Sequence, residues 1–183
     1  MADPKQLVNT SKFLSFVLRH KPDSIGLSLD QEGWAEVDEL LACASRHGRR
    51  IERALLLQVV EADDKQRYAL SEEGARVRAV QGHSRGLVSI SYLPLQPPPQ
   101  LFHGTAERFV KSIFEKGLQP RGRQHVHLSA SHSTAISVGQ RHGEPVVLAV
   151  DARQMHSDGS QFFQAENGVW LTEHVPTKYL TRT

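Results

Sequence analysis

The sequence has little cysteine and no long apolar run. Cys43 is its single cysteine, which excludes an internal disulfide bond and any cysteine-rich zinc site. The longest obvious apolar stretch, residues 146–150, is far short of the roughly 18 residues that a membrane span needs. Asp3 and Pro4 stand where a signal peptide carries basic residues and then an apolar segment. We therefore expect a soluble, cytoplasmic protein that needs no oxidising compartment and no membrane.

An excess of one charge is also missing. The chain has 22 basic and 20 acidic residues, so its net charge is +2, and neither the part before Leu93 nor the part after it is a basic tail. So small a net charge does not by itself predict a nucleic-acid partner. The 183 residues allow one medium domain or two small ones of ordinary globular composition. Because no heptad pattern is present, we expect a monomer.

The glycine-rich motifs that bind nucleotides in common folds are absent. No Gly-x-Gly-x-x-Gly occurs, so a Rossmann dinucleotide site has no support. Residues 117–123 space two glycines as a P-loop does, but no Lys-Ser/Thr follows, and a helix rather than a strand is expected before them. Three neighbouring histidines, His125, His127 and His132, have no convincing carboxylate or thiolate to complete a metal site. We therefore expect no metal.

Proline concentrates in one place, residues 94–100, which include three consecutive prolines. Such a run favours an extended, semi-rigid spacer over a helix or a central strand. This composition predicts a first domain over residues 1–93, a linker over residues 94–100 and a second domain over residues 101–183.

Apolar spacing before the linker predicts three helices and then a hairpin. The expected helices cover residues 7–20, 37–48 and 50–62, and the expected strands cover residues 66–70 and 76–80. Three helices followed by a hairpin are typical of a winged helix. Winged helices bind nucleic acid in some proteins and only mediate protein contacts in others, so the fold alone does not decide the function.

The second domain has a mixed order of elements. Strands are expected over residues 101–103, 126–129, 146–150 and 168–171, and helices over residues 107–116 and 133–142. This order predicts an α+β lobe.

Four side chains of these elements have an ordinary explanation when each is considered alone. Arg19 and His20 end a helix, where basic groups complement the negative end of the helix dipole. Arg67 fits an exposed charge of a hairpin, and Arg141 fits a charge at a helix end. Only their combination indicates a functional site.

Seven segments of the chain carry a resemblance to a known family. They are TSKFLSFVLRHKP (10–22), KQRY (65–68), AVQGHS (79–84), LFHGT (101–105), QHVHLS (124–129), GQRHG (139–143) and ENGVWLT (166–172). In this order, and across both lobes, they resemble the NAD-dependent RNA 2'-phosphotransferase family. The resemblance implies an α+β protein with an N-terminal winged-helix RNA lobe and a C-terminal lobe of ADP-ribosyltransferase fold.

The resemblance also implies an enzyme with a two-step reaction in which NAD+ is consumed as a co-substrate. An internal RNA 2'-phosphate attacks the nicotinamide ribose and expels nicotinamide, which leaves RNA joined to ADP-ribose through the phosphate. The ribose 2''-hydroxyl then attacks that phosphate. The products are 2'-hydroxyl RNA and ADP-ribose 1'',2''-cyclic phosphate, so the implied partners are NAD+ and RNA that carries a 2'-phosphate.

Motif match assigns the reacting phosphate to three arginines, Arg19, Arg67 and Arg141, whose guanidinium groups suit a phosphate monoester of nearly two negative charges. Because the first two precede the linker and the third follows it, we expect the phosphate site between the lobes. His20 matches the active-site histidine of the family. As a group that titrates near neutrality it can orient or deprotonate the 2''-hydroxyl, or protonate the departing RNA oxygen.

The resemblance places five residues in the NAD pocket, and Arg123 either near the NAD pyrophosphate or in solvent as a loop charge. The glycine of the pocket is expected to let the backbone approach the nicotinamide riboside. The pocket residues are His103, Gly104, Thr105, His127 and Ser129.

Val169 stands where many ADP-ribosyltransferases carry a glutamate that activates the acceptor. An anionic phosphate needs no base to become a nucleophile, so this position disfavours protein ADP-ribosylation. Two alternatives stay open. One is ADP-ribosylation of terminal nucleic-acid phosphates, which stops after the first step, and the other is a non-catalytic winged-helix sensor of NAD or ADP-ribose.

Overall fold

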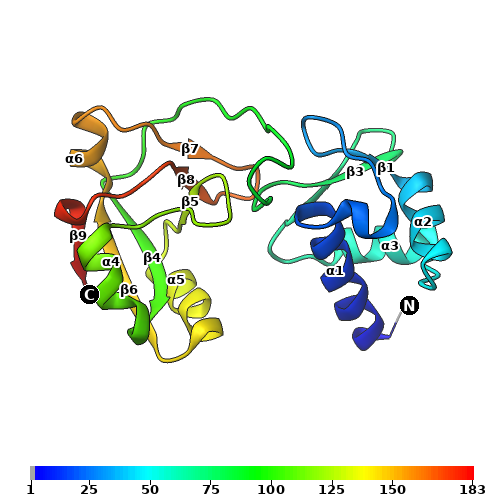
Figure 1. Ribbon diagram of the computed structural model, residues 1–183, viewed down its shortest axis with the longest axis horizontal. Helices are drawn as coiled ribbons and strands as arrows, with labels where there is room; N and C mark the ends of the chain where they lie inside the picture. Colours follow the sequence, from blue (N-terminus) through cyan, green and yellow to red (C-terminus); the bar gives the residue numbers. More distant parts are fainter. Residues whose placement is uncertain (1–2) are drawn as a thin grey trace. The chain divides into compact units, whose positions relative to one another are not determined.

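The computed structural model describes residues 3–183, and the chain divides into two compact units, one ending at Ser91 and one covering Tyr92–Thr183 (Figure 1). Both units combine helices with short antiparallel strands, and the described strands form three sheets of three strands each. The expected α+β class is therefore confirmed. No helix within residues 3–183 is both long enough and apolar enough to cross a membrane.

The first unit consists of three helices, a 3-10 turn and one sheet. Its elements, in chain order, are α1 (Pro4–Arg19), η1 (Pro22–Ile25), β1 (Ala35–Glu36), α2 (Val37–Arg46), α3 (Arg53–Glu61), β2 (Tyr68–Leu70) and β3 (Arg76–Ala79).

Helix α1 carries the first pair of predicted site residues at its end. Asp3 caps its start by accepting a hydrogen bond from the Lys5 amide, and Pro4 occupies the first turn, where its missing amide is harmless. Leu14, Val17 and Leu18 are fully buried on one face of the helix, against α3 and the sheet. The helix starts three residues before the predicted residue 7, because a capped proline start extends it beyond the apolar stripe.

The sheet of the first unit has the strand order β1-β3-β2, with antiparallel pairs throughout. Strand β1 has two residues, too few to show an alternating pattern, and the sequence did not indicate it. The Tyr68 hydroxyl donates a 2.6 Å hydrogen bond to the Ser11 carbonyl. This bond ties β2 to α1, so the hairpin and the helix that hold the predicted site residues form one body.

The second unit contains two sheets, three helices and two 3-10 turns. Its elements are β4 (Gln100–Ala106), α4 (Glu107–Lys116), β5 (Val126–Leu128), α5 (His132–Gly139), η2 (Gln140–His142), β6 (Pro145–Asp151), α6 (Ala152–Ser157), β7 (Phe163–Gln164), β8 (Trp170–Thr172), η3 (Thr177–Tyr179) and β9 (Leu180–Arg182).

Strand β6 is the middle strand of the β4-β6-β9 sheet. Its residues 146–150 are all buried, which explains why they form an uninterrupted apolar run rather than an alternating one. Helix α5 packs on β4 and β6. The second sheet has the order β5-β8-β7, and the two sheets meet where Phe102 and Ser129 exchange two backbone hydrogen bonds of 2.8 Å. Strand β4 is thus held by β6 on one edge and by the end of β5 on the other.

Strand β9 covers the outer edge of β6 and is itself tied to a helix. Arg182 makes two hydrogen bonds to the Glu107 carboxylate at the start of α4, of 3.0 and 2.6 Å. Thr183 donates from its amide to the Val147 carbonyl at 3.2 Å. The last residues therefore complete the sheet.

The proline-rich segment, expected as a spacer over residues 94–100, belongs to the second unit and contacts the rest of that unit at both of its ends. Pro94 forms a backbone bridge with Phe163, and the Leu95 amide donates to the Phe162 carbonyl at 2.8 Å. Gln100 already belongs to β4. An extended proline segment offers its carbonyls and its non-proline amides to a neighbouring strand, so the run lies along the unit.

Candidate functional site

The segment 80–84 of the first unit contacts all three site residues that the sequence predicted there. The Val80 amide donates to the Arg67 carbonyl at 3.0 Å, and the Ser84 amide donates to the Arg19 carbonyl at 2.8 Å. Ser84 Oγ lies 3.0 Å from His20 Nδ1. The structure therefore brings Arg19, His20 and Arg67 to one segment, although 48 positions separate Arg19 from Arg67 (67 − 19).

Arg67 is held by a buried carboxylate. Asp63 Oδ1 accepts from Arg67 Nε at 2.9 Å and from Nη2 at 2.6 Å, and Asp63 Oδ2 accepts from the Arg67 amide. The Asp63 side chain is 1% exposed and that of Arg67 is 34% exposed. Burial by itself would raise the pKa of Asp63, but the hydrogen bonds and charge of Arg67 outweigh it and the pKa is lowered. Asp63 fixes the direction of the guanidinium group, and Nη1 takes no part in the pair.

The turn before Ser84 is close to Arg19. Gly82 has a φ of +87°, and a Cβ atom there would lie 3.7 Å from the Arg19 guanidinium, so a side chain would strain the backbone beside that group. His83 is 3% exposed, and burial lowers its pKa to about 4, helped by the positive charges of Arg19, His20 and Arg78. His83 is therefore neutral at pH 7, and it adds no positive charge beside Arg19.

In the second unit, the junction of β4 and β5 gathers three of the five predicted pocket residues. His103 Nδ1 lies 3.1 Å from the His127 carbonyl, and Ser129 follows β5 in its bridge to Phe102. A carbonyl only accepts, so His103 Nδ1 carries the proton and Nε2 is left as an acceptor. Burial lowers the pKa of His103, as do the positive charges of His142 and Arg123, despite the bond to His127. This ring is neutral at pH 7.

Arg123 contacts the second histidine of the junction. Its Nη1 donates to His127 Nδ1 at 2.6 Å. A guanidinium only donates, so His127 Nδ1 accepts and the proton of the neutral ring is on Nε2. Burial lowers the pKa of Arg123, but a guanidinium stays charged at neutral pH. The junction thus presents one imidazole acceptor, one imidazole donor and one positive charge.

Gly104 faces helix α5, whereas the sequence suggested that it lets the backbone approach the co-substrate. A Cβ atom at Gly104 would lie 1.8 Å from the Ala135 carbonyl oxygen and 2.9 Å from the Gly139 amide nitrogen. Gly139 in turn faces the backbone oxygen of Thr105, which a Cβ atom would approach to 2.6 Å. The structure gives this glycine a packing reason, because α5 lies on this face of β4, and the expected access of the co-substrate stays a prediction.

Arg141 lies in the 3-10 turn η2, directly after α5, and is exposed. The turn η2 packs against β4, and its His142 is one of the charges that lower the pKa of His103. The predicted helix over residues 133–142 ends earlier, at Gly139, because the chain tightens into η2. Arg141 belongs to a different unit from Arg19 and Arg67, so its joint action with them stays a prediction.

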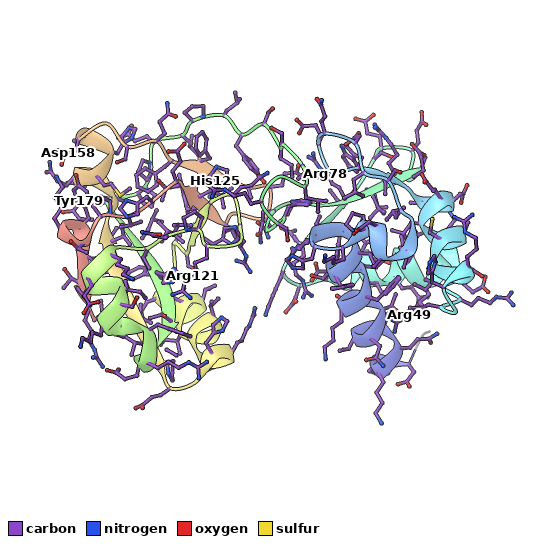
Figure 2. The ribbon with its side chains drawn as sticks, viewed as in Figure 1. Arg49, Arg78, Arg121, His125, Asp158 and Tyr179 are labelled. Atoms are coloured by element: carbon purple, nitrogen blue, oxygen red, sulfur yellow. The ribbon has the colours of Figure 1, made fainter. Side chains whose placement is uncertain are left out.

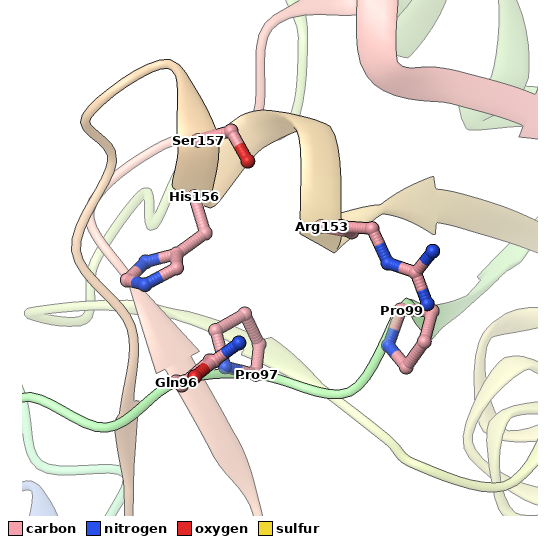
Figure 3. A pocket seen from close by; sticks show the side chains of 6 residues that line it. All are labelled: Gln96, Pro97, Pro99, Arg153, His156 and Ser157. Carbon is pink, nitrogen blue, oxygen red and sulfur yellow. The ribbon is translucent and has the colours of Figure 1, made fainter.

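Neither a metal site nor the pocket beside α6 includes the predicted residues. Among residues 3–183, no group of three His, Cys, Asp or Glu side chains is placed to hold a metal ion. A pocket of about 260 Å³ lies where the proline-rich segment passes α6 (Figure 3) and contains none of the predicted site residues. Its lining residues are Gln96, Pro97, Pro99, Arg153, His156 and Ser157.

Asp63 and Ser84 contact site residues, and the sequence analysis assigned them no role. A signal for Asp63 existed, because an acid four residues before an arginine is a common ion-pair spacing. Ser84 ends the segment 79–84 that carries part of the family resemblance, but its spacing indicates no partner. It lies 64 positions from His20, and nothing local in the sequence indicates that the two meet.

The comparisons with known proteins bear on these residues as a set. A family model described as "RNA 2'-phosphotransferase, Tpt1 / KptA family" matches residues 5–174. Proteins named "Probable RNA 2'-phosphotransferase" are 60% identical in Pseudomonas aeruginosa, over 97% of this chain and 98% of that protein, and 59% identical in Agrobacterium fabrum, over 94% and 92%. One in Shigella boydii is 54% identical over 96% of both chains. With both units covered, the chain belongs to the RNA 2'-phosphotransferase family.

Proposed function

We propose that the chain is an RNA 2'-phosphotransferase that transfers an internal RNA 2'-phosphate to NAD+ in two steps. In the first step, a phosphate oxygen forms a bond to C1'' of the nicotinamide ribose, and nicotinamide leaves with the electron pair of the broken bond. In the second step, the ribose 2''-oxygen attacks the phosphorus of the RNA-2'-phospho-ADP-ribose intermediate, and the RNA 2'-oxygen leaves and takes a proton. The products are 2'-hydroxyl RNA, ADP-ribose 1'',2''-cyclic phosphate and nicotinamide.

The observation that carries the proposal is the meeting of Arg19, His20 and Arg67 at segment 80–84 in a member of this family. In the proposal, Arg19 and Arg67 bind the 2'-phosphate, and Arg141 of the second unit joins them. Forked, charge-assisted hydrogen bonds suit a dianionic phosphate and stabilise the charge that develops during its transfer. The Asp63 contacts support this role, because they hold Arg67 in one orientation before the substrate arrives.

His20 is exposed at the end of α1 and acts, in the proposal, through its Nε2 atom. Its Nδ1 atom is occupied by Ser84 Oγ. An imidazole oriented in this way can take a proton from the 2''-hydroxyl or give one to the RNA 2'-oxygen. Both events belong to the second step, so His20 contributes mainly there.

The residues at the β4-β5 junction fit NAD+ as a co-substrate. The nicotinamide ring carries a positive charge, and a neutral His103 with an acceptor Nε2 does not repel it. In the proposal, Thr105, His127 and Ser129 line the pocket, where His127 and Ser129 donate to ribose or amide groups. In the proposal, Arg123, which donates to His127, neutralises the pyrophosphate.

Two further assignments complete the proposal. The three helices and the β1-β3-β2 sheet of the first unit form a winged-helix RNA lobe. The two packed sheets of the second unit form an ADP-ribosyltransferase-like NAD lobe. The half-buried Val169 supports a phosphate as the acceptor, because a neutral hydroxyl or amide acceptor would need a base at that position.

Purified protein is incubated with a short RNA that carries one internal 2'-phosphate, with and without NAD+, and the RNA and nucleotide products are resolved. The expected result is 2'-hydroxyl RNA and ADP-ribose cyclic phosphate, both only with NAD+. A stable ADP-ribosylated RNA would instead favour modification of phosphates without the second step. Binding of NAD+ without release of nicotinamide would favour a sensor.

A further inference from the structure

Ser84 contacts α1 through two independent hydrogen bonds. Its amide donates to the Arg19 carbonyl at 2.8 Å, and its hydroxyl lies 3.0 Å from His20 Nδ1. The first bond fixes the Ser84 backbone relative to the end of the helix, so the second bond has a defined direction. Because Nδ1 is occupied, the Nε2 edge of the imidazole is turned away from segment 80–84.

A hydroxyl differs from a carboxylate as a partner for an imidazole, because it both donates and accepts. A carboxylate partner would keep a proton on Nδ1 and favour the charged ring. A serine hydroxyl can accept from Nδ1–H, so that Nε2 has the lone pair that takes a proton, or donate to Nδ1, so that the proton is on Nε2. The ring is therefore held in place in either protonation pattern.

The rest of the segment makes this contact rigid. His83, next to Ser84, is 3% exposed and lies against Gly33, where a Cβ atom would be 3.1 Å from its Nε2 atom. Gly82 lies against Arg19. A buried histidine on one side and a glycine turn on the other leave the Ser84 side chain little freedom to move from His20.

We propose that Ser84 is a positioning residue for His20, which orients the imidazole through the second step while leaving both proton positions available. The inference rests on the proposed function, because it assigns Ser84 to the step in which His20 exchanges a proton.

The test uses the full chain with Ser84→Ala, Ser84→Thr and, as a matched control, Ser28→Ala, an exposed serine of the same unit. Single-turnover reactions with NAD+ and the 2'-phosphorylated RNA give separate rates for formation and decay of the RNA-ADP-ribose intermediate. Thermal unfolding is measured for each variant.

Ser84→Ala is expected to slow decay of the intermediate by about 3- to 10-fold, the usual effect of one lost hydrogen bond, and to leave its formation and the KM for RNA unchanged. Ser84→Thr retains the hydroxyl and is expected to restore decay. Equal decay rates in Ser84→Ala and Ser28→Ala would overturn the inference, as would equal slowing of both steps with a lower Tm. If the unsubstituted protein shows no NAD-dependent reaction, the proposed function fails instead.

A second, independent observation is the distribution of charge in the first unit. Residues 46–53 contain four arginines, at positions 46, 49, 50 and 53, and one glutamate, at position 52, which gives a net charge of +3 (4 − 1). The whole chain has a net charge of +2, so the remaining residues together carry −1 (2 − 3). The segment, between α2 and the start of α3, is therefore locally basic; Arg50 pairs with Glu52 and Arg53 with Asp38, so Arg46 and Arg49 carry its exposed positive charge. We refer to it as the 46–53 segment.

The 46–53 segment is tied to the helix that carries Arg19 and His20. The Arg49 guanidinium lies 4.6 Å from the centre of the Phe13 ring on α1, and Figure 2 labels Arg49 beside that helix. Arg46 donates to Cys43 Sγ at 3.1 Å, which does not neutralise its charge. Arg46 and Arg49 are both exposed. Arg19 stands six positions after Phe13 on the helix, which is about 9 Å along the helix axis. This distance corresponds to two to three phosphate spacings of a nucleic-acid strand.

The geometry points to the 46–53 segment as a docking surface for the phosphodiester backbone of the RNA that flanks the reacting nucleotide. Arginines suit phosphates, and the surface lies along the same helix as the proposed 2'-phosphate site. This inference also rests on the proposed function, because it extends the substrate beyond one nucleotide.

The test compares a 2'-phosphorylated trinucleotide with a 2'-phosphorylated RNA of about 20 nucleotides, at several salt concentrations. The double variant Arg46→Gln/Arg49→Gln is paired with Lys111→Gln/Lys116→Gln on α4, which removes the same charge from exposed positions of the second unit. The arginine variant is expected to raise the KM of the long RNA about 10-fold, to leave the trinucleotide unchanged and to reduce the salt slope by about 2.

Two results would overturn this second inference. One is an equal KM in the arginine and lysine variants, and the other is an equal effect on the trinucleotide, which would place the arginines at the reacting nucleotide. Absence of turnover in the unsubstituted protein would refute the proposed function itself.

Discussion

Gly104→Ala tests whether the glycine at the centre of β4 serves packing or access of the co-substrate. The backbone of Gly104 is in an ordinary extended conformation, with no positive φ, so alanine brings no conformational strain of its own. Its added Cβ atom would lie 1.8 Å from the Ala135 carbonyl oxygen, whereas ordinary contact starts at 3.4 Å. Helix α5 would therefore have to move away from β4 by about 1.6 Å (3.4 − 1.8).

The expected cost follows from the type of atoms that meet. Both near atoms, the Ala135 oxygen and the Gly139 nitrogen, are backbone atoms of one helix, so no side-chain rotation relieves the contact. Overpacking of a well-packed core costs about 1 to 3 kcal/mol, and a clash with backbone belongs at the upper end, about 3 kcal/mol. For a chain of this size each kcal/mol lowers the Tm by roughly 2 to 4 °C, so we expect a decrease of about 6 to 12 °C.

Thermal unfolding monitored by circular dichroism, with NAD+ binding measured by calorimetry, distinguishes the two roles. The matched control is Gly122→Ala in the same unit, where nothing lies within 4 Å of the added Cβ atom and φ is not positive. It should change the Tm little. A Gly104→Ala protein as stable as this control would refute the packing argument, and loss of NAD+ binding at unchanged stability would restore the access role.

Three further predictions concern the first unit. Arg67→Ala or His20→Ala should slow the second step more than the first, so that the RNA-ADP-ribose intermediate accumulates in gel assays; unchanged turnover would refute the site assignment. Because the pKa of His83 is lowered from 6.5 to about 4, the unfolded chain binds more protons between these values, so stability is full above pH 6.5 and falls as the pH decreases towards 4. Urea titrations should show a smaller loss in His83→Gln. Asp63→Asn should destabilise the chain by about 1.5 to 3 kcal/mol at pH 7, the usual value of hydrogen bonds to a charged group. Because the pKa of Asp63 is lowered in the folded chain, the difference in stability should vanish as the pH falls below 3.8, the usual pKa of an aspartate. A difference that does not depend on pH would contradict the ion-pair argument.

The sequence predicted those helices and strands that are long enough to show a recognisable pattern of apolar residues. Helix α4 was expected over residues 107–116 and has these bounds, because its apolar stripe is bounded by the strand before it and Gly117 after it. The uninterrupted apolar run of β6 also indicated its strand, which extends one residue further at each end. The six-residue helix α6 and the strands β1, β7 and β9, of two or three residues each, show no period within their length, and only pairing with neighbours creates them.

The candidate site residues could be named from motifs, whereas the contacts that hold them could not be predicted. Arg19, His20 and Arg67 stand in motifs, and the structure places all three at segment 80–84. The orientation of Arg67 by Asp63, and of His20 by Ser84, depends on distances across folded elements that no local pattern encodes. The close contact between Gly104 and the backbone of α5 could not be predicted either, since it depends on where α5 crosses β4.

The pairing of β9 with β6 has a practical consequence for handling the protein. Without its last strand, the valine-rich β6 would present an open row of amides and carbonyls, which is a template for a strand from another molecule. A purification tag joined directly after Thr183, or trimming by a carboxypeptidase, would act on the few residues that close this edge. Samples shortened at this end should therefore form soluble aggregates on storage, while samples extended before α1 should stay monodisperse in light scattering.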